Sequence, residues 1–331
     1  MRDENIHAPH TRLAEVLSDD LNAVSELIRT RMASKHAPRI PEVTAHLVEA
    51  GGKRLRPMLT LAAANMLGYS GTHHQLLAAT VEFIHTATLL HDDVVDESAQ
   101  RRGRPTANLL WDNKSSVLVG DYLFARSFQL MTETGSIDVL NILANASATI
   151  AEGEVLQLTA SQDLRTNQDT YLQVVRGKTA ALFSAACEVG AVVANAPKAQ
   201  QEALFAYGDA LGIAFQIADD LLDFWGDDGI GKNRGDDFRE RKLTLPIILA
   251  IAEADDAERA FWVRTIEKGR QEEGDLEQAL ALMNKHGTLE ATRDIANSWA
   301  DKAKTALTAL PEHPIRELLS EIADYVVRRL N

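Results

Sequence analysis

The chain has 331 residues, of which 45% are hydrophobic and 25% charged, the balance of a folded globular protein. Its formal net charge of −14 argues against nucleic acid as a partner. No apolar run approaches the roughly 18 residues that a membrane span needs. The first residues do not have the apolar core that we would expect of a signal peptide. A single cysteine, Cys187, rules out an internal disulfide and favours a reducing, cytoplasmic compartment.

Apolar residues recur every three or four positions along most of the chain, the spacing of helices with a buried face. In chain order the clearest such segments are 13–32, 81–97, 117–131, 138–158, 203–225, 245–254 and 314–330. Several are apolar almost all the way round, which is typical of helices inside a large bundle. The breaks between segments are too short for interdomain linkers. We therefore predict an all-α fold in which residues 1–331 form one domain.

The apolar stretch 81–90 leads directly into three aspartates, Asp92, Asp93 and Asp96. On a helix they occupy an arc of roughly 100°, with Asp92 and Asp96 one turn apart. A solvated acidic face is the ordinary interpretation, but the apolar approach predicts half-buried carboxylates, which must be paired or bind metal. Because the ligand set is all oxygen, it suits Mg²⁺, which completes its shell with water and substrate phosphate.

A second cluster, Asp219, Asp220 and Asp223, repeats this pattern within another apolar helix, and Gln216 lies one turn earlier on the same side. Two such clusters in one all-helical chain are a stronger signal than either alone. If the two faces oppose each other across the bundle, their carboxylates could hold a group of divalent ions that binds a diphosphate.

Basic residues gather in several short segments, against the acidic average of the chain. They are Lys53, Arg54, Arg56, Arg101, Arg102, Arg104, Arg176, Lys178, Lys232, Arg239, Arg241 and Lys242. Any one segment could simply expose its charges to water. Arginine forks and lysine ammonium groups both suit phosphate oxygens, so together with two metal sites they indicate more than one polyphosphate ligand.

The chain resembles the trans-type isoprenyl diphosphate synthases, the polyprenyl synthetases, over nearly its whole length after about residue 40. The resemblance rests on GGKRLRP, LLHDDVVDESAQRRGRPT, GDYLFARSF, GKTA, FQIADDLLDF and GKNRGDDFRERKLTLP, in that order. It implies a single helical bundle around a deep central cavity, usually homodimeric, with three Mg²⁺ ions. It also implies a prenyltransferase that condenses isopentenyl diphosphate with an allylic diphosphate.

The resemblance further implies roles for single residues. The metal ligands would be Asp92, Asp96 and Asp219, with Asp93 and Asp223 completing the two clusters. The pocket for isopentenyl diphosphate, which binds without metal, would comprise Lys53, Arg56, His85 and Arg102. The allylic diphosphate would be held by Arg101, Lys178, Lys232 and Lys242. Thr179 and Gln216 would lie near the developing cation, with Asp220 also in the catalytic set. The chain departs from many relatives at Arg241, where they have glycine, but Lys242 is kept and we expect the same reaction.

Product length is predicted from the residues before the first aspartate cluster. Family members that stop at fifteen carbons commonly have an aromatic residue there, whereas this chain has Ala87 and Thr88. An open tunnel at that level predicts an all-trans product of about eight to ten isoprene units, about C40–C50, the size used in quinone side chains. A geranylgeranyl or farnesyl diphosphate synthase is the alternative. Candidates for the tunnel floor, for which core packing is an equally good interpretation, are Phe124, Phe128, Leu130 and Met131.

Three other functions compete with this interpretation. The doublet His91–Asp92 is compatible with an HD-type phosphohydrolase, which would need further buried histidines. A terpene cyclase shares the first aspartate motif but does not need GGKRLRP and His85. A catalytically silent subunit of a heteromeric synthase usually lacks one aspartate cluster, and here both are intact.

Overall fold

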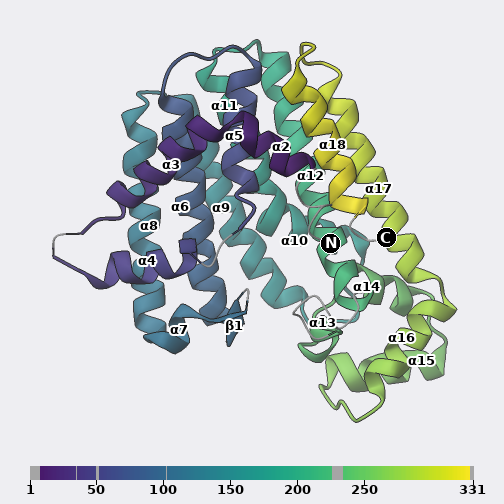
Figure 1. The fold of residues 1–331 in the computed structure, drawn as a ribbon. Coiled ribbons are helices and arrows are strands. Elements are labelled where there is room, and N and C mark those ends of the chain that lie inside the picture. Colours follow the sequence, from purple (N-terminus) through teal and green to yellow (C-terminus); the bar gives the residue numbers. More distant parts are fainter. Residues whose placement is uncertain (1–7, 35, 50–51, 102, 226–233, 329–331) are drawn as a thin grey trace. The chain divides into compact units, whose positions relative to one another are not determined.

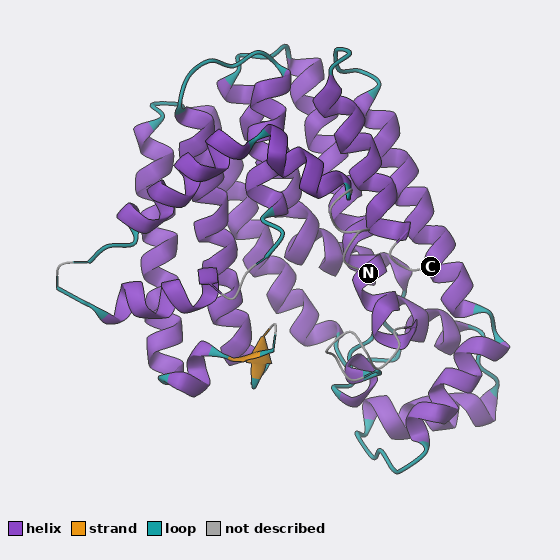
Figure 2. Ribbon diagram, in the orientation of Figure 1, coloured by secondary structure: helices purple, strands orange, loops and turns teal. Residues whose placement is uncertain are grey.

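A computed structural model describes residues 8–34, 36–49, 52–101, 103–225 and 234–328. Within these ranges the chain is helical, apart from a two-stranded hairpin and connecting loops (Figure 2). The hairpin pairs β1 (Gln100–Arg101) with β2 (Arg104–Pro105), which run antiparallel. The predicted all-α class is thus confirmed. No helix in the described ranges combines the length and apolar character needed to cross a membrane.

The contacts within the chain divide it into two compact units. The first comprises residues 1–147, 182–205 and 307–319. The second comprises residues 148–181, 206–306 and 320–331. The first aspartate cluster belongs to the first unit and the second cluster to the second unit. That residues 1–331 form one domain, and that the two clusters oppose each other, both stay predictions.

The first unit is organised around α6 (His73–Val95), the helix that ends in the first aspartate cluster (Figure 1). Its other helices are α2 (Pro9–Val16), α3 (Ser18–Arg31), α4 (Arg39–Glu49), α5 (Leu55–Met66), α7 (Ala107–Leu110), α8 (Asn113–Glu133) and most of α11 (Ala181–Val193). Because α6 is apolar almost all round, it can contact α3, α4, α5, α7 and α8 at once. Its last turn carries Asp92 and Asp93.

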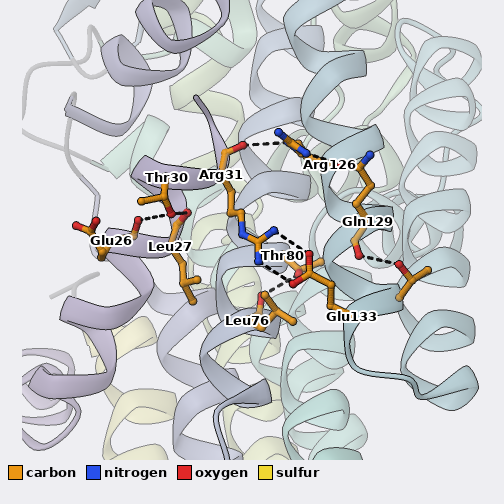
Figure 3. A network of polar contacts seen from close by, with 10 residues as sticks. Glu26, Leu27, Thr30, Arg31, Leu76, Thr80, Arg126, Gln129 and Glu133 are labelled. Carbon is orange, nitrogen blue, oxygen red and sulfur yellow. Dashed lines mark hydrogen bonds and ion pairs between the residues drawn. The ribbon is translucent and has the colours of Figure 1, made fainter. Parts of the chain in front are cut away.

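A polar network joins the end of α3 to α8 (Figure 3). The Arg31 guanidinium donates to both carboxylate oxygens of Glu133, at 2.8 and 2.7 Å. Arg126 Nε in turn donates to the Arg31 carbonyl at 3.0 Å. Since the last carbonyls of a helix have no partner within it, Arg126 caps α3 while the ion pair anchors it. The two arginines thereby fix α3 on α8, and α6 packs against both helices.

The second unit contains the helices that carry and surround the second aspartate cluster. They are α10 (Gln168–Val175), η1 (Arg176–Ala180), α13 (Asp236–Arg239), α14 (Leu245–Ala252), α15 (Asp256–Trp262), η2 (Val263–Glu267), α16 (Asp275–Lys285) and α17 (Thr288–Leu307). Both units share α9 (Ile137–Ala160), α12 (Lys198–Trp225) and α18 (Pro314–Arg328).

An aromatic cluster anchors α13, the short helix that follows the second aspartate motif. The Phe238 ring stacks on Phe261, with centroids 6.5 Å apart, and meets Trp262 edge-on at 6.4 Å. Phe238 and Trp262 are almost completely buried. Burial of such large side chains contributes about 1.5–3 kcal/mol each, so α13 is held in place although four residues alone would not form a stable helix.

Candidate active site

The first aspartate cluster lies at the C-terminal end of α6. Asp92 is half-buried, Asp93 is completely buried, and Asp96 is exposed where it caps the helix. The amide of Asp96 donates to the Asp92 carbonyl at 2.8 Å, so these two residues are one turn apart as predicted. Helical rotation of about 100° per residue therefore turns Asp93 into the protein while Asp92 and Asp96 remain accessible to water.

Asp93 is paired with Arg101. Both Nε and Nη2 of Arg101 lie 2.8 Å from Asp93 Oδ1. The other carboxylate oxygen, Oδ2, is buried, and none of the described residues donates a hydrogen bond to it. A buried carboxylate needs partners on both oxygens, so Asp93 Oδ2 has room in its coordination for a cation. The pair also ties the β1 strand, which carries Arg101, to the end of α6.

In the second cluster, Asp220 is the most strongly constrained member. It is 7% exposed, and it accepts hydrogen bonds from Tyr171 Oη at 2.6 Å and from Gln216 Nε2 at 2.7 Å. Burial raises the pKa of Asp220 to about 7, and the negative charges of Asp219 and Asp223 add to the rise. The two donated hydrogen bonds act in the opposite direction and favour the ionised form.

The chain of hydrogen bonds continues from Gln216 to Thr179, two residues predicted to lie near the developing cation. Thr179 Oγ1 donates to Gln216 Oε1 at 2.8 Å, while the amide nitrogen of Gln216 is occupied by Asp220. The structure thus brings Thr179, Gln216 and Asp220 together. It adds Tyr171, which the sequence analysis missed although it lies in the same helical run as GKTA.

Lys178 and Thr179 lie in η1, a π-helical turn, in which the backbone bonds from i to i+5 rather than i+4. Gly177 and Gly153 of α9 allow this turn to approach α9 closely, because a Cβ on Gly177 would lie 2.7 Å from the Gly153 Cα. At this crossing, Lys178 Nζ forms an ion pair with Glu154 Oε2 at 3.0 Å. Glu154 is a second residue that the sequence analysis missed. Its Oε1 is buried, and no described residue donates to it.

Asp223 and Lys242 are connected through α13. Asp223 Oδ2 accepts a hydrogen bond from the backbone amide of Asp237 at 3.1 Å, in the first turn of that helix. At the other end of the helix, the amide of Lys242 donates to the Asp237 carbonyl at 2.8 Å. Asp223 therefore positions the short helix that precedes Lys242. The Lys242 ammonium forms an ion pair with Glu240.

Arg241 adopts a backbone conformation that favours glycine. Its φ is +61°, in the left-handed region, and its amide donates to the Phe238 carbonyl at 3.0 Å. With the Lys242–Asp237 bond, this is a Schellman motif, which favours glycine at the left-handed residue. The arginine compensates through its side chain, since Nε and Nη2 donate to the carbonyls of Ile266 and Glu267 at 2.7 and 2.6 Å.

Two of the residues predicted to bind isopentenyl diphosphate meet in the first unit. Arg56 Nη1 lies 3.4 Å from His85 Nε2, and the Arg56 guanidinium lies 4.4 Å above the Phe183 ring. Lys53 is exposed just before α5. Two further predicted phosphate ligands, Arg102 and Lys232, lie outside the described residues.

The predicted product-length residues differ in their environments. On α6, Ala87 is completely buried and Thr88 half-buried. On α8, the Phe124 ring stacks on His91, with centroids 5.9 Å apart and planes at 24°. Leu130 and Met131 are buried in the core, but Phe128 is 41% exposed, so simple core packing does not account for it. The tunnel role of these residues stays a prediction.

The donor atoms fit a hard divalent cation, although they are not arranged as a closed cage. Among the described residues, no group of three or more His, Cys, Asp and Glu side chains converges on one point. Mg²⁺ usually takes one or two protein carboxylates and completes its shell with water and phosphate, so a closed cage is not required. The orphaned Asp93 Oδ2 and the all-oxygen chemistry of both clusters match this preference.

Residues 37–283 match the profile of the polyprenyl synthetase family, and relatives cover almost the whole chain. The chain belongs to the polyprenyl synthetase family, whose members are metal-dependent prenyltransferases. This assignment confirms the resemblance stated from the motifs, and it sets aside the HD-type phosphohydrolase.

Several relatives carry the names of long-chain synthases. The octaprenyl diphosphate synthase of Escherichia coli is 44% identical over 320 residues, which are 96% of this chain and 98% of that protein. The decaprenyl diphosphate synthase structure from Rhodobacter capsulatus is 72% identical with a TM-score of 0.95, covering 97% of this chain and 99% of that one. A polyprenyl synthase structure from Caulobacter crescentus, complexed with calcium and isoprenyl diphosphate, is 53% identical with a TM-score of 0.92, covering 97% and 98%.

Two substitutions separate the cost of the left-handed backbone at Arg241 from the stabilisation by its side-chain hydrogen bonds. Arg241→Ala keeps the left-handed backbone but loses both side-chain hydrogen bonds, so we expect it to lower the free energy of unfolding by about 1–3 kcal/mol. Arg241→Gly loses the same bonds but removes the left-handed cost of about 1 kcal/mol, so it should be the milder change. Urea denaturation of both variants measures the difference. A glycine variant no more stable than the alanine variant would contradict this explanation.

Proposed function

We propose that this chain is a Mg²⁺-dependent trans-prenyltransferase that adds isopentenyl diphosphate repeatedly to an allylic diphosphate, giving a long all-trans polyprenyl diphosphate. The observation that carries the proposal is that adjacent aspartates have two different environments in both clusters. In each, one aspartate is locked by protein donors, Asp93 by Arg101 and Asp220 by Tyr171. Its neighbour, Asp92 or Asp219, is half-buried and accessible to water, as a ligand to a hydrated ion must be.

The residues that would hold Mg²⁺ are Asp92, Asp96 and Asp219, with three ions expected from the family. Bound Mg²⁺ supplies Lewis-acid stabilisation of the negative charge that develops on the departing diphosphate. The basic residues that would add positive charge for the departing diphosphate are Arg101, Arg102, Lys178, Lys232 and Lys242. Lys178 already meets a carboxylate, that of Glu154, so its ammonium is held in place before substrate arrives.

The remaining groups act on the second substrate and on the cation. Lys53, Arg56, Arg102 and His85 bind isopentenyl diphosphate by charge and hydrogen bonds. The allylic C–O bond breaks with its electron pair on the diphosphate, and the isopentenyl double bond forms the new bond to C1. The Thr179 hydroxyl donates its hydrogen to the Gln216 carbonyl and presents its oxygen lone pairs to positive charge, and apolar walls exclude water that would quench the cation. The proton lost from C2 passes to the departing diphosphate.

We propose a product of about eight to ten isoprene units, the lengths in the names of the octaprenyl, nonaprenyl and decaprenyl synthases among the relatives. Ala87 and Thr88 support this because neither narrows the space beside the first aspartate cluster with an aromatic ring. A quinone side chain is the use we propose for the product. Loss of the long-tailed quinone from a strain lacking this protein would test that use, and cell fractionation would test the proposed cytoplasmic location.

We also propose that the protein is a homodimer that pairs through exposed apolar side chains of α8. Leu118 is 66% exposed there, and Phe128 is 41% exposed. Exposed apolar side chains of this size on one helix are typical of a subunit interface. Leu118→Glu should shift the sedimentation coefficient from that of a dimer to that of a monomer. A wild-type protein that sediments as a monomer would contradict the proposal.

The central experiment is incubation with labelled isopentenyl diphosphate, farnesyl diphosphate and Mg²⁺, followed by chromatographic sizing of the dephosphorylated products. We expect products of about C40–C50 that require the divalent ion. Release of phosphate without chain growth, or growth that stops at fifteen or twenty carbons, would refute the long-chain assignment.

Within the same assay, Asp92→Ala should lower kcat by about a hundredfold or more, since the ion it holds acts mainly on the transition state. The KM for isopentenyl diphosphate, which binds without metal, should change less than about threefold. Asp301→Ala, at an exposed aspartate of α17, is the matched control and should leave both constants unchanged. Equal losses in kcat and in isopentenyl diphosphate affinity would count against the assigned role of Asp92.

Thr88→Phe should shorten the product, because a ring at this half-buried position on α6 would project one turn before Asp92 and block further growth. Thr88→Val keeps the shape of threonine and serves as the control. Product sizing of both variants checks the prediction. An unchanged length distribution in the phenylalanine variant would show that the growing chain does not pass this position.

A further inference from the structure

Four side chains of the second unit form one continuous line of hydrogen bonds. Tyr171 of α10 bonds to Asp220, Asp220 to Gln216, and Gln216 to Thr179 of η1. The three bonds measure 2.6, 2.7 and 2.8 Å, all within the distances of well-formed hydrogen bonds. The line begins and ends on the same run of helix, α10 continued by η1, and its two middle members lie one turn apart on α12.

The direction of every bond in this line is determined by its charged member. In its ionised form the Asp220 carboxylate only accepts, so both Tyr171 and Gln216 then donate to it. Because the amide nitrogen of Gln216 is committed to Asp220, its carbonyl oxygen faces Thr179. The Thr179 hydroxyl must then donate to that oxygen, which leaves its own lone pairs directed elsewhere. The orientation of the Thr179 hydroxyl therefore depends on Tyr171, at the other end of the line.

Tyr171 takes no part in the chemistry proposed above, and it is as deeply buried as Thr179 at the other end of the line. It is 5% exposed, and the hydroxyl reaches Asp220 Oδ2, the oxygen that Gln216 does not use. Removing the hydroxyl would leave Oδ2 buried without that donor. The carboxylate could then rotate, and Gln216 would lose the partner that determines which way its amide faces.

We propose that Tyr171 is a positioning residue for prenyl transfer, acting through Asp220 and Gln216 to orient the Thr179 hydroxyl and to hold the turn of α12 that carries Asp219. Asp220 is then the anchor of this line, and Asp219 beside it is the metal ligand. The inference rests on the proposed function, because it names a residue that prepares the same site.

Tyr171→Phe tests the inference directly, since it removes one hydroxyl and preserves the volume of the ring. We expect kcat to fall about ten- to a hundredfold, the effect of removing a hydrogen bond to a buried charged group. The KM for isopentenyl diphosphate should stay within about threefold, because that pocket draws on residues of the first unit. Tyr207→Phe is the matched control, at a completely buried tyrosine of α12 outside the line, and should leave kcat unchanged. Equal losses in the two variants, or an unfolded Tyr171→Phe, would make Tyr171 a structural residue and overturn the proposal.

A double-variant cycle distinguishes action through the line from independent damage. Thr179→Val removes the hydroxyl at the other end, and Thr179→Ser keeps it. If Tyr171 acts through this line, adding Tyr171→Phe to the Thr179→Val variant should lower kcat by less than about a further threefold. Adding Tyr171→Phe to the Thr179→Ser variant should lower kcat by nearly as much as Tyr171→Phe lowers it in the wild type. Multiplicative losses in both backgrounds would refute the coupling.

A binding measurement keeps this inference separate from the proposed function. Mg²⁺ with inorganic pyrophosphate should raise the melting temperature of the wild type and of Tyr207→Phe by the same amount, and that of Tyr171→Phe by less, because Asp219 is held less firmly. If the wild type forms no prenyl product, the proposed function fails, while this comparison still decides the role of Tyr171. Identical shifts in all three proteins would contradict that role.

Discussion

Buried negative charge is the constraint on which the rest of this structure depends. A carboxylate removed from water must be given donors or a cation, and otherwise it destabilises the fold. Asp93 and Asp220 are both enclosed in apolar helices, and each is held by a partner from another element, Arg101 or Tyr171. The pKa of Asp220 is raised to about 7 because its donors offset only part of the cost of burying the charge. In both clusters, a neighbouring element, β1 or α10, is placed so that it supplies the partner.

The helix itself separates the roles of adjacent aspartates. A rotation of about 100° per residue turns one member of each pair inward and leaves its neighbour at the edge of the apolar surface. The inward residue becomes an anchor, and the outer residue remains accessible to water and to a hydrated ion. Two consecutive aspartates can therefore take different roles in the same cluster.

Two basic residues of the proposed site are already paired with carboxylates of the protein. Arg101 is paired with Asp93 and Lys178 with Glu154, in each case across two different elements of secondary structure. Such pairs offset the repulsion that clustered lysines and arginines would otherwise cause, and they limit the number of side-chain conformations that substrate must select. The close contact of Gly153 with Gly177 is what brings α9 near enough to the π-helical turn for the Lys178 pair to form.

Sequence reasoning was sufficient for features that depend on local chemistry. The apolar periodicity predicted the all-α class, and the order of six motifs identified the polyprenyl synthetase family and its reaction. Tyr171 and Glu154 were missed because a tyrosine or a glutamate in a helix has no distinctive spacing, and its meaning depends on which distant helix it meets. Arg241 could be recognised as a departure from glycine, but its two compensating hydrogen bonds to η2 could not be foreseen.

The sequence by itself therefore determined that the chain is helical and which class of enzyme it is. Those properties are encoded in neighbouring residues, because helical periodicity and motif spacing act over a few turns. Only the tertiary structure decided that Asp220 is an anchor, that Gln216 faces Thr179, and that Lys178 is held by Glu154. Each of these facts depends on two helices meeting at a particular depth and rotation, and packing of the whole chain sets that geometry.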